Sequence, residues 1–336
     1  MTCGEVACRS SFVFESQYAF GTLEDARALI GRDFIHRKGA IGVSEALIRL
    51  FCSVTEDANS SFWDRDFATA QWGGILSPPA MLMAWLSPLP WTPGGGEIPR
   101  QGGLAVPLPG NRIINAVHES WFYEPIRVGD RLSITEQIAA VSDLKESHLG
   151  PGHFVTTNSR IVRQDGVEVA GHSNQVLRYT PWTEKPEAKA KPARPAAAAE
   201  APAGNAIPDL TMKATRLKAV FVPATTLDIM EGHYDPDSVT ARQSGGLSFN
   251  TFQILGLFNR HVTDWAGPRT FVRHQQIRVI RPFLEGTTGT VSGRAIPDEG
   301  GEPGRFIVVA ALRDDAGTDY ATCKIALSVL EGPFAR

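Results

Sequence analysis

The sequence predicts an α+β protein built from two similar units, each an antiparallel sheet wrapped around a long central helix. Three observations support this prediction: a polar segment that divides the chain, an internal similarity between the two parts, and one apolar stretch that needs cover on all sides. The chain has 336 residues, a length that suggests two domains rather than one.

A segment rich in Pro, Ala, Lys and Glu divides the chain. It reads PWTEKPEAKAKPARPAAAAEAPAGNAIPD and contains almost nothing to bury. Such a composition is typical of an extended linker, and the alternative, a long surface loop inside one domain, is uncommon at this length. We therefore expect a first unit at 1–180, a linker at 181–212 and a second unit at 213–336.

The two units share short patterns in the same order. DANSSFWD at 57–64 matches DIMEGHYD at 228–235, and QWGGIL at 71–76 matches QSGGLS at 243–248. Further along, YEPIRVGDRL in the first unit and IRPFLEGTTG in the second both place a Gly four residues after a Pro. Three matches in one order indicate a duplicated unit.

Each unit is expected to contain an apolar helix after its Gly-Gly pair, followed by antiparallel strands. The helical segments are SPPAMLMAWL in the first unit and FNTFQILGLFNRHV in the second. Because TFQILGLF has no polar face, it must be covered nearly all round, which a curved sheet can do. The strand segments alternate apolar with polar residues and contain turn signals such as QDG and DDAG.

Composition excludes several classes of protein. A net charge of −3 argues against a nucleic-acid partner. The four cysteines have no paired spacing, which predicts free thiols in a reducing compartment and no zinc site. We expect no membrane span, because no long apolar run occurs, and no secretory signal, because the first residues lack its basic and apolar regions. The expected location is the cytoplasm.

A carboxylate and an imidazole, Asp228 and His233, lie close together in TTLDIMEGHYDPDS. Positions i and i+5 do not share a helix face, so these side chains can meet only where the chain bends, and EGHYDPD has the residues for a bend. A carboxylate and an imidazole that share one water can perform general acid–base catalysis. The alternative is a capped turn, in which Asp235 precedes Pro236 at a helix start.

With these motifs, the chain resembles the double-hotdog members of the MaoC-like dehydratase and (R)-specific enoyl-CoA hydratase family. EDANSSFWDRDFATAQWGGILSPPAML and ESWFYEPIRVGDRLSI carry the likeness in the first unit. In the second, DIMEGHYDPD takes the place of the family's D-x-N-P-x-H-x-D-P motif, and GLFNRHVTDWAG is also similar. Met230 and Glu231 replace the motif's Asn-Pro. In the first unit Asp57 is kept, but Phe62 stands where the His would be.

The resemblance implies a hydro-lyase that adds water to a 2-enoyl-CoA, or removes it from a 3-hydroxyacyl-CoA of (3R) configuration. Asp228 and His233 are the implied catalytic pair, with His233 the expected base. Asn250 falls in the family frame of the second unit and is an expected substrate contact. The backbone N–H groups of Gly246, Leu247 and Ser248, at the start of the apolar helix, are the expected donors to the thioester oxygen.

The first unit, having lost the dyad, is expected to accommodate the acyl group, which could be as bulky as a steroid side chain. Its expected contacts are Phe62, Trp63 and Trp72, since aromatic faces supply large apolar area. Arg278, on an alternating strand pattern, is an expected contact for the CoA diphosphate. Coenzyme A belongs to the substrate, and neither a separate cofactor nor a metal site is expected.

Two other functions fit the same residues. One is a non-catalytic or partner subunit of a heteromeric enoyl-CoA hydratase that binds acyl-CoA, which the replaced Asn-Pro and the empty first site favour. The other is an acyl-CoA thioesterase on the same fold. The expected assembly is a homodimer or a hetero-oligomer with another hotdog protein, and neither nucleic acid nor a membrane is an expected partner.

Overall fold

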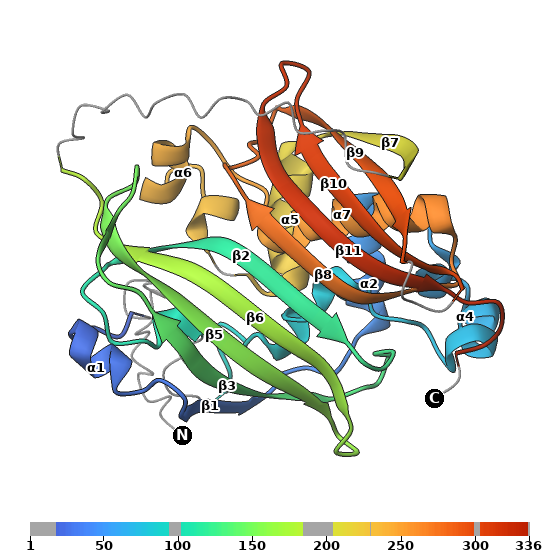
Figure 1. Ribbon diagram of the computed structural model, residues 1–336, viewed down its shortest axis with the longest axis horizontal. Coiled ribbons are helices and arrows are strands. Elements are labelled where there is room, and N and C mark those ends of the chain that lie inside the picture. Colours follow the sequence, from blue (N-terminus) through green and yellow to red (C-terminus); the bar gives the residue numbers. More distant parts are fainter. Residues whose placement is uncertain (1–17, 94–101, 184–203, 229, 299–302, 335–336) are drawn as a thin grey trace, which may run out of the picture.

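The structure is a computed structural model that describes residues 18–93, 102–183, 204–228, 230–298 and 303–334. Within this part of the chain, eleven strands form one antiparallel sheet (Figure 1). The strand order is β1-β3-β5-β6-β2-β8-β11-β10-β9-β7, and the short β4 pairs with β5. The architecture is therefore α+β, with helices against one face of a large curved sheet.

The elements of the first unit are α1 (Leu23–Arg27), β1 (Asp33–Lys38), α2 (Glu45–Thr55), α3 (Ser60–Trp63), α4 (Arg65–Trp72), η2 (Pro79–Met81), η3 (Ala84–Leu86), η4 (Gly102–Leu104), β2 (Arg112–Phe122), β3 (Leu132–Val141), β4 (Lys145–Glu146), β5 (Pro151–Arg163) and β6 (Glu168–Tyr179). Those of the second unit are β7 (Asn205–Lys213), α5 (Arg216–Thr226), η5 (Glu231–His233), α6 (Val239–Ser244), α7 (Thr251–Ala266), β8 (Thr270–Val279), β9 (Thr288–Pro297), β10 (Arg305–Arg313) and β11 (Asp319–Val329).

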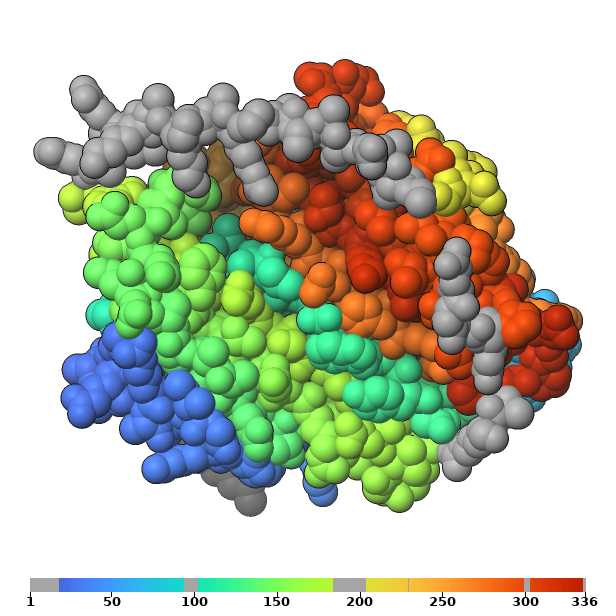
Figure 2. Space-filling model, in the orientation of Figure 1, coloured from blue at the N-terminus to red at the C-terminus, as the bar shows by residue number. Residues whose placement is uncertain are grey.

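The sheet consists of two five-stranded halves, and the order of strands from the outer edge to the centre is the same in both. The first half runs β1-β3-β5-β6-β2, and the second runs β8-β11-β10-β9-β7. They meet where β2 pairs with β8, from Val117 opposite Arg278 to Trp121 opposite His274. In Figure 2 the strand β2 lies directly beside β8, and the two halves form one continuous outer face. The repeated order agrees with the internal duplication predicted from the sequence.

The central helix of the second unit, α7, is enclosed as its apolar sequence predicts. It contacts β7, β8, β9 and β11 on one side and α2 and α5 on the other, and Figure 1 shows these helices together behind the strands. Leu257, Phe258 and Val262 are among its buried side chains. Asn250 caps its first turn and Gly267, at φ 83°, ends it. The prediction of a long helix wrapped by a sheet is confirmed for this unit.

The first unit lacks the long helix that the sequence led us to expect after its Gly-Gly pair. Two 3₁₀ turns, η2 and η3, stand in its place. Pro88 and Pro90 follow directly after η3, and proline both removes a helical N–H donor and clashes with the preceding turn. This part of the prediction was therefore wrong. The apolar residues are nevertheless buried, as Met81, Trp85 and Leu86 show.

The second unit begins earlier than the predicted boundary at residue 213. Residues 205–213 form β7, which pairs with β9 at the edge of the sheet. Ile207 and Met212 are buried there, so the end of the supposed linker supplies core residues. The stretch 184–203, which holds most of the Pro- and Ala-rich segment, lies outside the described residues.

We expect Gly256→Ala to destabilise the protein, although alanine is the better helix former by about 1 kcal/mol. A Cβ at position 256 would lie 2.8 Å from Phe51 Cζ and 3.0 Å from Thr55 Cγ2, both on α2. Such over-filling typically costs about 1–3 kcal/mol, so the free energy of unfolding in urea should fall by roughly 1 kcal/mol. Gly332→Ala, where a Cβ meets no atom within 4 Å, is the control. A more stable Gly256→Ala variant would contradict the close contact of α7 with α2.

Candidate active site

Asp228 and His233 converge at the amino end of α7. Leu227, at φ 54°, ends α5 in a left-handed conformation, and Asp228 follows it. His233 is the last residue of η5, and its Nε2 lies 3.8 Å from Asp228 Oδ2. The His233 side chain is 19% exposed and that of Asp228 is 15% exposed, so both are largely buried but reachable. The structure thus contains the bend that the spacing of Asp228 and His233 predicted.

Asn250 ties this pair to the helix. Its Oδ1 accepts the N–H of Gln253, which caps α7, while its Nδ2 lies 3.1 Å from Asp228 Oδ2 and 3.2 Å from Thr226 Oγ1. The other carboxylate oxygen, Asp228 Oδ1, accepts the N–H of Met230. Because Asn250 is only 1% exposed, these contacts are shielded from water. The orientation of Asp228 is therefore fixed from two sides.

The environment of His233 selects one tautomer. Its Nδ1 lies 2.8 Å from the carbonyl oxygen of Ser248 and 3.3 Å from Ser248 Oγ. A carbonyl oxygen can only accept, so Nδ1 carries the hydrogen in this contact. In the neutral ring Nε2 then has a free lone pair, and it is the atom on the side of Asp228. The geometry suits a base at Nε2.

Two of the three expected backbone donors are already engaged. The N–H of Gly246 donates to Ala241 O at 2.9 Å, and that of Ser248 donates to Gly232 O at 3.2 Å. Among the described residues the N–H of Leu247 has no hydrogen-bond acceptor. The expected set of three donors is therefore corrected to one, Leu247. The Gly246 and Ser248 bonds shape the turn instead.

The expected substrate contacts of the first unit have different surroundings. Phe62 is buried and lines a pocket described below. Trp63 donates its indole N–H to Asp57 O at 2.7 Å and lies beneath the Arg49 guanidinium. Trp72 is a core residue, 1% exposed, that packs against Phe271, so a substrate cannot reach it in this structure. The expectation for Trp72 is therefore corrected.

Arg278 also lies away from the dyad. On β8 it alternates with Ile277, which is fully buried in the core. The Arg278 side chain is exposed, so it lies on the face of the sheet opposite to Ile277 and the core, where α7 is packed. The structure does not bring it together with Asp228 and His233. Asp235, the alternative helix cap, instead accepts the N–H of Asp237, and Ser238 caps α6.

The first unit repeats the dyad turn with different side chains. Glu56, at φ 57°, ends α2 as Leu227 ends α5. Asp57 Oδ1 then accepts the N–H of Asn59 at 3.0 Å, as Asp228 Oδ1 accepts that of Met230. Gly73 and Gly74 also repeat the positive φ angles of the second pair, Gly245 and Gly246. The backbone of the dyad turn is therefore retained.

Two side chains needed for the dyad are missing from the first turn. Phe62 replaces the His, as the sequence analysis noted, and Pro78 stands at the position of Asn250. The second replacement was not recognised from the sequence. It could have been found by extending the Gly-Gly match, since GGILSPP and GGLSFNT align Pro78 with Asn250.

Asp57 lies in a pocket formed by both units. The walls of this pocket come from α3, the segment after Gly74, the end of β2, α7 and the start of β8. Asp228, His233 and Asn250 are not among its lining residues. The pKa of Asp57 is raised from 3.8 to about 6, mainly by burial and to a smaller extent by nearby Asp264, against the lowering effects of the Asn59 N–H and Arg260.

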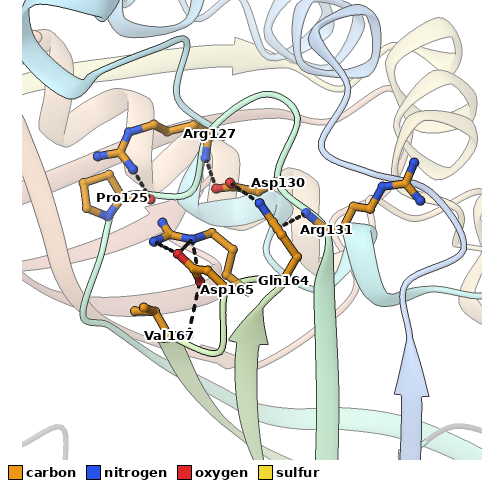
Figure 3. A network of polar contacts seen from close by, with 8 residues as sticks. Pro125, Arg127, Asp130, Arg131, Gln164, Asp165 and Val167 are labelled. Carbon is orange, nitrogen blue, oxygen red and sulfur yellow. Dashed lines mark hydrogen bonds and ion pairs between the residues drawn. The ribbon is translucent and has the colours of Figure 1, made fainter.

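A polar network holds one wall of this pocket (Figure 3). The turn between β2 and β3 contributes Pro125 to the lining. Within that turn the N–H of Arg127 donates to Asp130 Oδ2 at 2.8 Å, and the N–H of Arg131 donates to Gln164 Oε1 at 2.7 Å. Arg127 also donates to the carbonyl of Trp72. The wall is thus anchored to both the β5–β6 hairpin and α4.

Comparison with known proteins gives a family match and two curated relatives. A sequence model described as the FAS1-like dehydratase domain region matches residues 28–172. A probable enoyl-CoA hydratase alpha subunit from Thermomonospora curvata is 29% identical over 172 residues, covering 47% of this chain and 52% of that protein. A 3-oxo-4,17-pregnadiene-20-carboxyl-CoA hydratase beta subunit from Mycobacterium tuberculosis is 28% identical over 126 residues, covering 38% of this chain and 95% of that protein. The match to the alpha subunit thus spans about half of its length.

Solved structures match over nearly the whole chain. A MaoC-like dehydratase aligns with a TM-score of 0.69 and 15% identity, covering 92% of this chain and 100% of that one. A conserved hypothetical protein from Mycobacterium tuberculosis, described as having a double hotdog fold, aligns with a TM-score of 0.64 and 15% identity, covering 93% and 99%. The chain has a double hotdog fold, and residues 28–172 match the FAS1-like dehydratase domain region. The fold and resemblance predicted from the sequence are confirmed, and at this identity the structural matches establish the fold.

Two further observations describe the double-hotdog chain. Within the described residues no helix has both the length and the apolar character to cross a bilayer. The same residues contain no group of three or more His, Cys, Asp or Glu side chains placed to hold a metal ion.

Asp57→Asn should change how stability depends on pH. The raised pKa means that the native state holds the Asp57 proton more tightly than the unfolded state, so the stability due to this group is complete below pH 3.8 and is lost as pH rises through about 6. The difference corresponds to about 3 kcal/mol. Urea unfolding should therefore show the variant gaining roughly that much relative to the wild type between pH 4 and pH 7.

The control for this effect is Asp66→Asn, at an exposed position of α4. Its stability relative to the wild type should be the same at both pH values. A parallel pH dependence for the wild type and Asp57→Asn would show that Asp57 titrates normally in the folded protein.

Proposed function

We propose that the second unit adds water to a 2-enoyl thioester of coenzyme A, with Asp228 and His233 sharing the reacting water. The observation that carries this proposal is the 3.8 Å separation of His233 Nε2 and Asp228 Oδ2. It is too long for a direct hydrogen bond, yet one water oxygen can lie within hydrogen-bonding distance of both atoms. The enoyl-CoA hydratase and steroid-CoA hydratase names of the two curated relatives support the reaction class.

His233 acts as the base in this scheme. Its Nδ1–H donates to Ser248 O, which leaves the Nε2 lone pair to take a proton from water as the water oxygen bonds to C3. A proton is delivered from the dyad to C2, so the net change is the addition of one water molecule. Asp228, oriented by Asn250, holds the water and shares the transferred proton.

Negative charge that builds on the thioester oxygen needs a donor close to the dyad. The N–H of Leu247 lies between the two engaged donors of the Gly-Gly turn, and it precedes the amino end of α7. The partial positive charge of a helix amino terminus favours an anion at that point. In this arrangement one backbone N–H, in place of the three expected from the sequence, and the amino end of α7 together stabilise the negative charge.

The first unit is proposed to accommodate a bulky acyl group. Support comes from the replacement of its central helix by η2 and η3, which leaves the inner face of that half of the sheet without a long covering helix. The relative whose name includes a pregnadiene carboxyl-CoA supports a polycyclic acyl group as one candidate. Hydration assays with 2-enoyl-CoA thioesters that differ in their acyl group would identify the preferred one.

The subunit names of both curated relatives favour a second candidate, a partner subunit of a heteromeric hydratase. This chain, however, joins two hotdog units through β2 and β8 and contains a converged dyad, which supports activity on its own. Thioester hydrolysis remains an outcome that the assay separates. A homodimeric or hetero-oligomeric assembly and the cytoplasmic location stay predictions from the sequence.

Asp228→Asn and His233→Gln should each lower kcat/KM for hydration of a 2-enoyl-CoA by about 10²- to 10⁴-fold, because each removes one partner of the reacting water. Activity is followed by the loss of enoyl absorbance, a mass gain of one water and an assay for free thiol. Matched controls are Asp315→Asn and His148→Gln, both at exposed positions, which should leave the rate unchanged.

Each alternative gives its own result in that assay. Thiol release without hydration would indicate a thioesterase, and binding of acyl-CoA with no turnover would indicate a partner subunit. Full hydration by both dyad variants would mean that Asp228 and His233 do not perform the chemistry.

Asn250→Ser should separate the helix cap from the orientation of Asp228. Serine still caps α7, so the free energy of unfolding should change by less than about 1 kcal/mol. It cannot reproduce the Nδ2 contact with Asp228, so kcat should fall by about tenfold or more, with stability as the internal control. Equal activity of Asn250→Ser and the wild type would show that Asp228 needs no orienting amide.

A further inference from the structure

The first unit retains a pocket at the place where its dyad was lost. We call it the Asp57 pocket. Residues of both units line it, including Asp57, Phe62, Pro78, Phe122, Asn259 and Phe271. The three Phe side chains make its walls largely apolar, and aromatic faces of this kind supply large contact areas for a ring or an alkyl group. A pocket with apolar walls and polar groups placed among them is the usual form of a small-molecule site.

One polar atom in this pocket has no partner. Asn259, on α7, is 4% exposed, and its Nδ2 donates to Gln275 Oε1 at 2.9 Å. Its Oδ1 is buried without a hydrogen-bond partner among the described residues. Because a buried acceptor without a donor costs free energy, the position favours a ligand that brings an N–H or O–H group to Asn259.

The second polar group is the Asp57 carboxyl, which is 5% exposed. One of its oxygens accepts the N–H of Asn59. In the equivalent turn of the second unit, Asn250 and His233 flank the carboxylate of Asp228. Phe62 and Pro78 occupy those positions around Asp57, and neither side chain can donate a hydrogen bond. Asp57 therefore faces apolar groups where its counterpart faces polar ones.

A hydroxyl can satisfy both side chains while the Asp57 carboxyl is protonated. Its one hydrogen is then donated to Asn259 Oδ1, and its oxygen accepts from the carboxyl. A ketone cannot donate to Asn259 at all. We propose that the Asp57 pocket is a second ligand site, which binds an apolar group carrying a hydroxyl that Asp57 and Asn259 recognise by hydrogen bonds.

This site is separate from the proposed dyad. Asn250 and Asn259 lie nine positions apart on α7, which corresponds to about 14 Å along the helix axis. The proposal therefore does not depend on hydration at Asp228 and His233. It gives the first unit a binding function of its own, at the turn where catalysis is lost.

The test uses the full chain and two fluorinated probes, 4-fluorobenzyl alcohol and its methyl ether, which is larger by one CH2 and has no hydrogen to donate. Titrations at about pH 5, below the raised pKa of about 6 at Asp57, are followed by ¹⁹F NMR and should give a Kd on the order of 1 mM for the alcohol. Binding of the ether should be about tenfold weaker, because it leaves Asn259 Oδ1 unpaired. Saturation is measured to about ten times the expected Kd.

Variants identify the residues responsible. Asn259→Leu, nearly equal in volume, should bind the two probes with equal affinity, because it removes the acceptor that only the alcohol can satisfy. Asp57→Leu should weaken the binding of both probes, because the oxygen of each accepts from the protonated carboxyl. Asp66→Leu, at an exposed position, should keep the tenfold preference. Near-UV circular dichroism of each variant checks that it is folded. Asp228→Asn should also keep the preference, which distinguishes this site from the failure or success of hydration.

Several results would overturn the proposal. They are the absence of saturable alcohol binding by the wild type, equal affinity of the wild type for both probes, a preference for the alcohol that survives in folded Asn259→Leu, or unchanged binding of both probes by folded Asp57→Leu. Loss of the preference in Asp228→Asn would place the alcohol at the dyad and would equally exclude a second site.

Discussion

The buried side chain of Asn250 joins the fold of the second unit to its proposed chemistry. Its oxygen caps α7, and its nitrogen contacts Asp228 and the end of α5. A buried amide group without a hydrogen-bond partner costs free energy, so the partners of Asn250 favour the arrangement of these three elements together. Pro78, at the equivalent position in the first unit, has neither an amide side chain nor an N–H. There the cap, the carboxylate contact and the long helix are all absent.

The overall architecture could be predicted because it depends on patterns that extend over many residues. The duplication was visible in three ordered matches, and the enclosure of α7 followed from its lack of a polar face. Two local features were not predicted. The apolar residues Ile207, Leu210 and Met212 of β7 were hidden at the end of a Pro- and Ala-rich segment and are interrupted by a register shift. Pro88 and Pro90 were not weighed against the apolar run before them. In both cases a few residues decided the local structure against the composition around them.

The candidate site was predictable in its residue types but less so in its contacts. The bend between Asp228 and His233 followed from their spacing, since no regular helix could bring them together. Which backbone N–H groups stay free depends on turns that close through Ala241 and Gly232, and sequence alone does not reveal such bonds. Trp72 and Arg278 show the same limit, because aromatic or charged character does not tell whether a side chain faces the core, the cleft or the solvent.

The pairing of β2 with β8 brings together, within a single polypeptide, two halves that could have been identical subunits. In a symmetric dimer one gene specifies both copies. A proline replacing Asn250 would therefore remove the cap and the carboxylate contact from both dyad turns at once. Here each half has its own codons, and a change in one is not imposed on the other. Because the two halves are encoded separately within one gene, a difference between them can be inherited. Phe62 and Pro78 could therefore arise in one half while His233 and Asn250 were kept in the other.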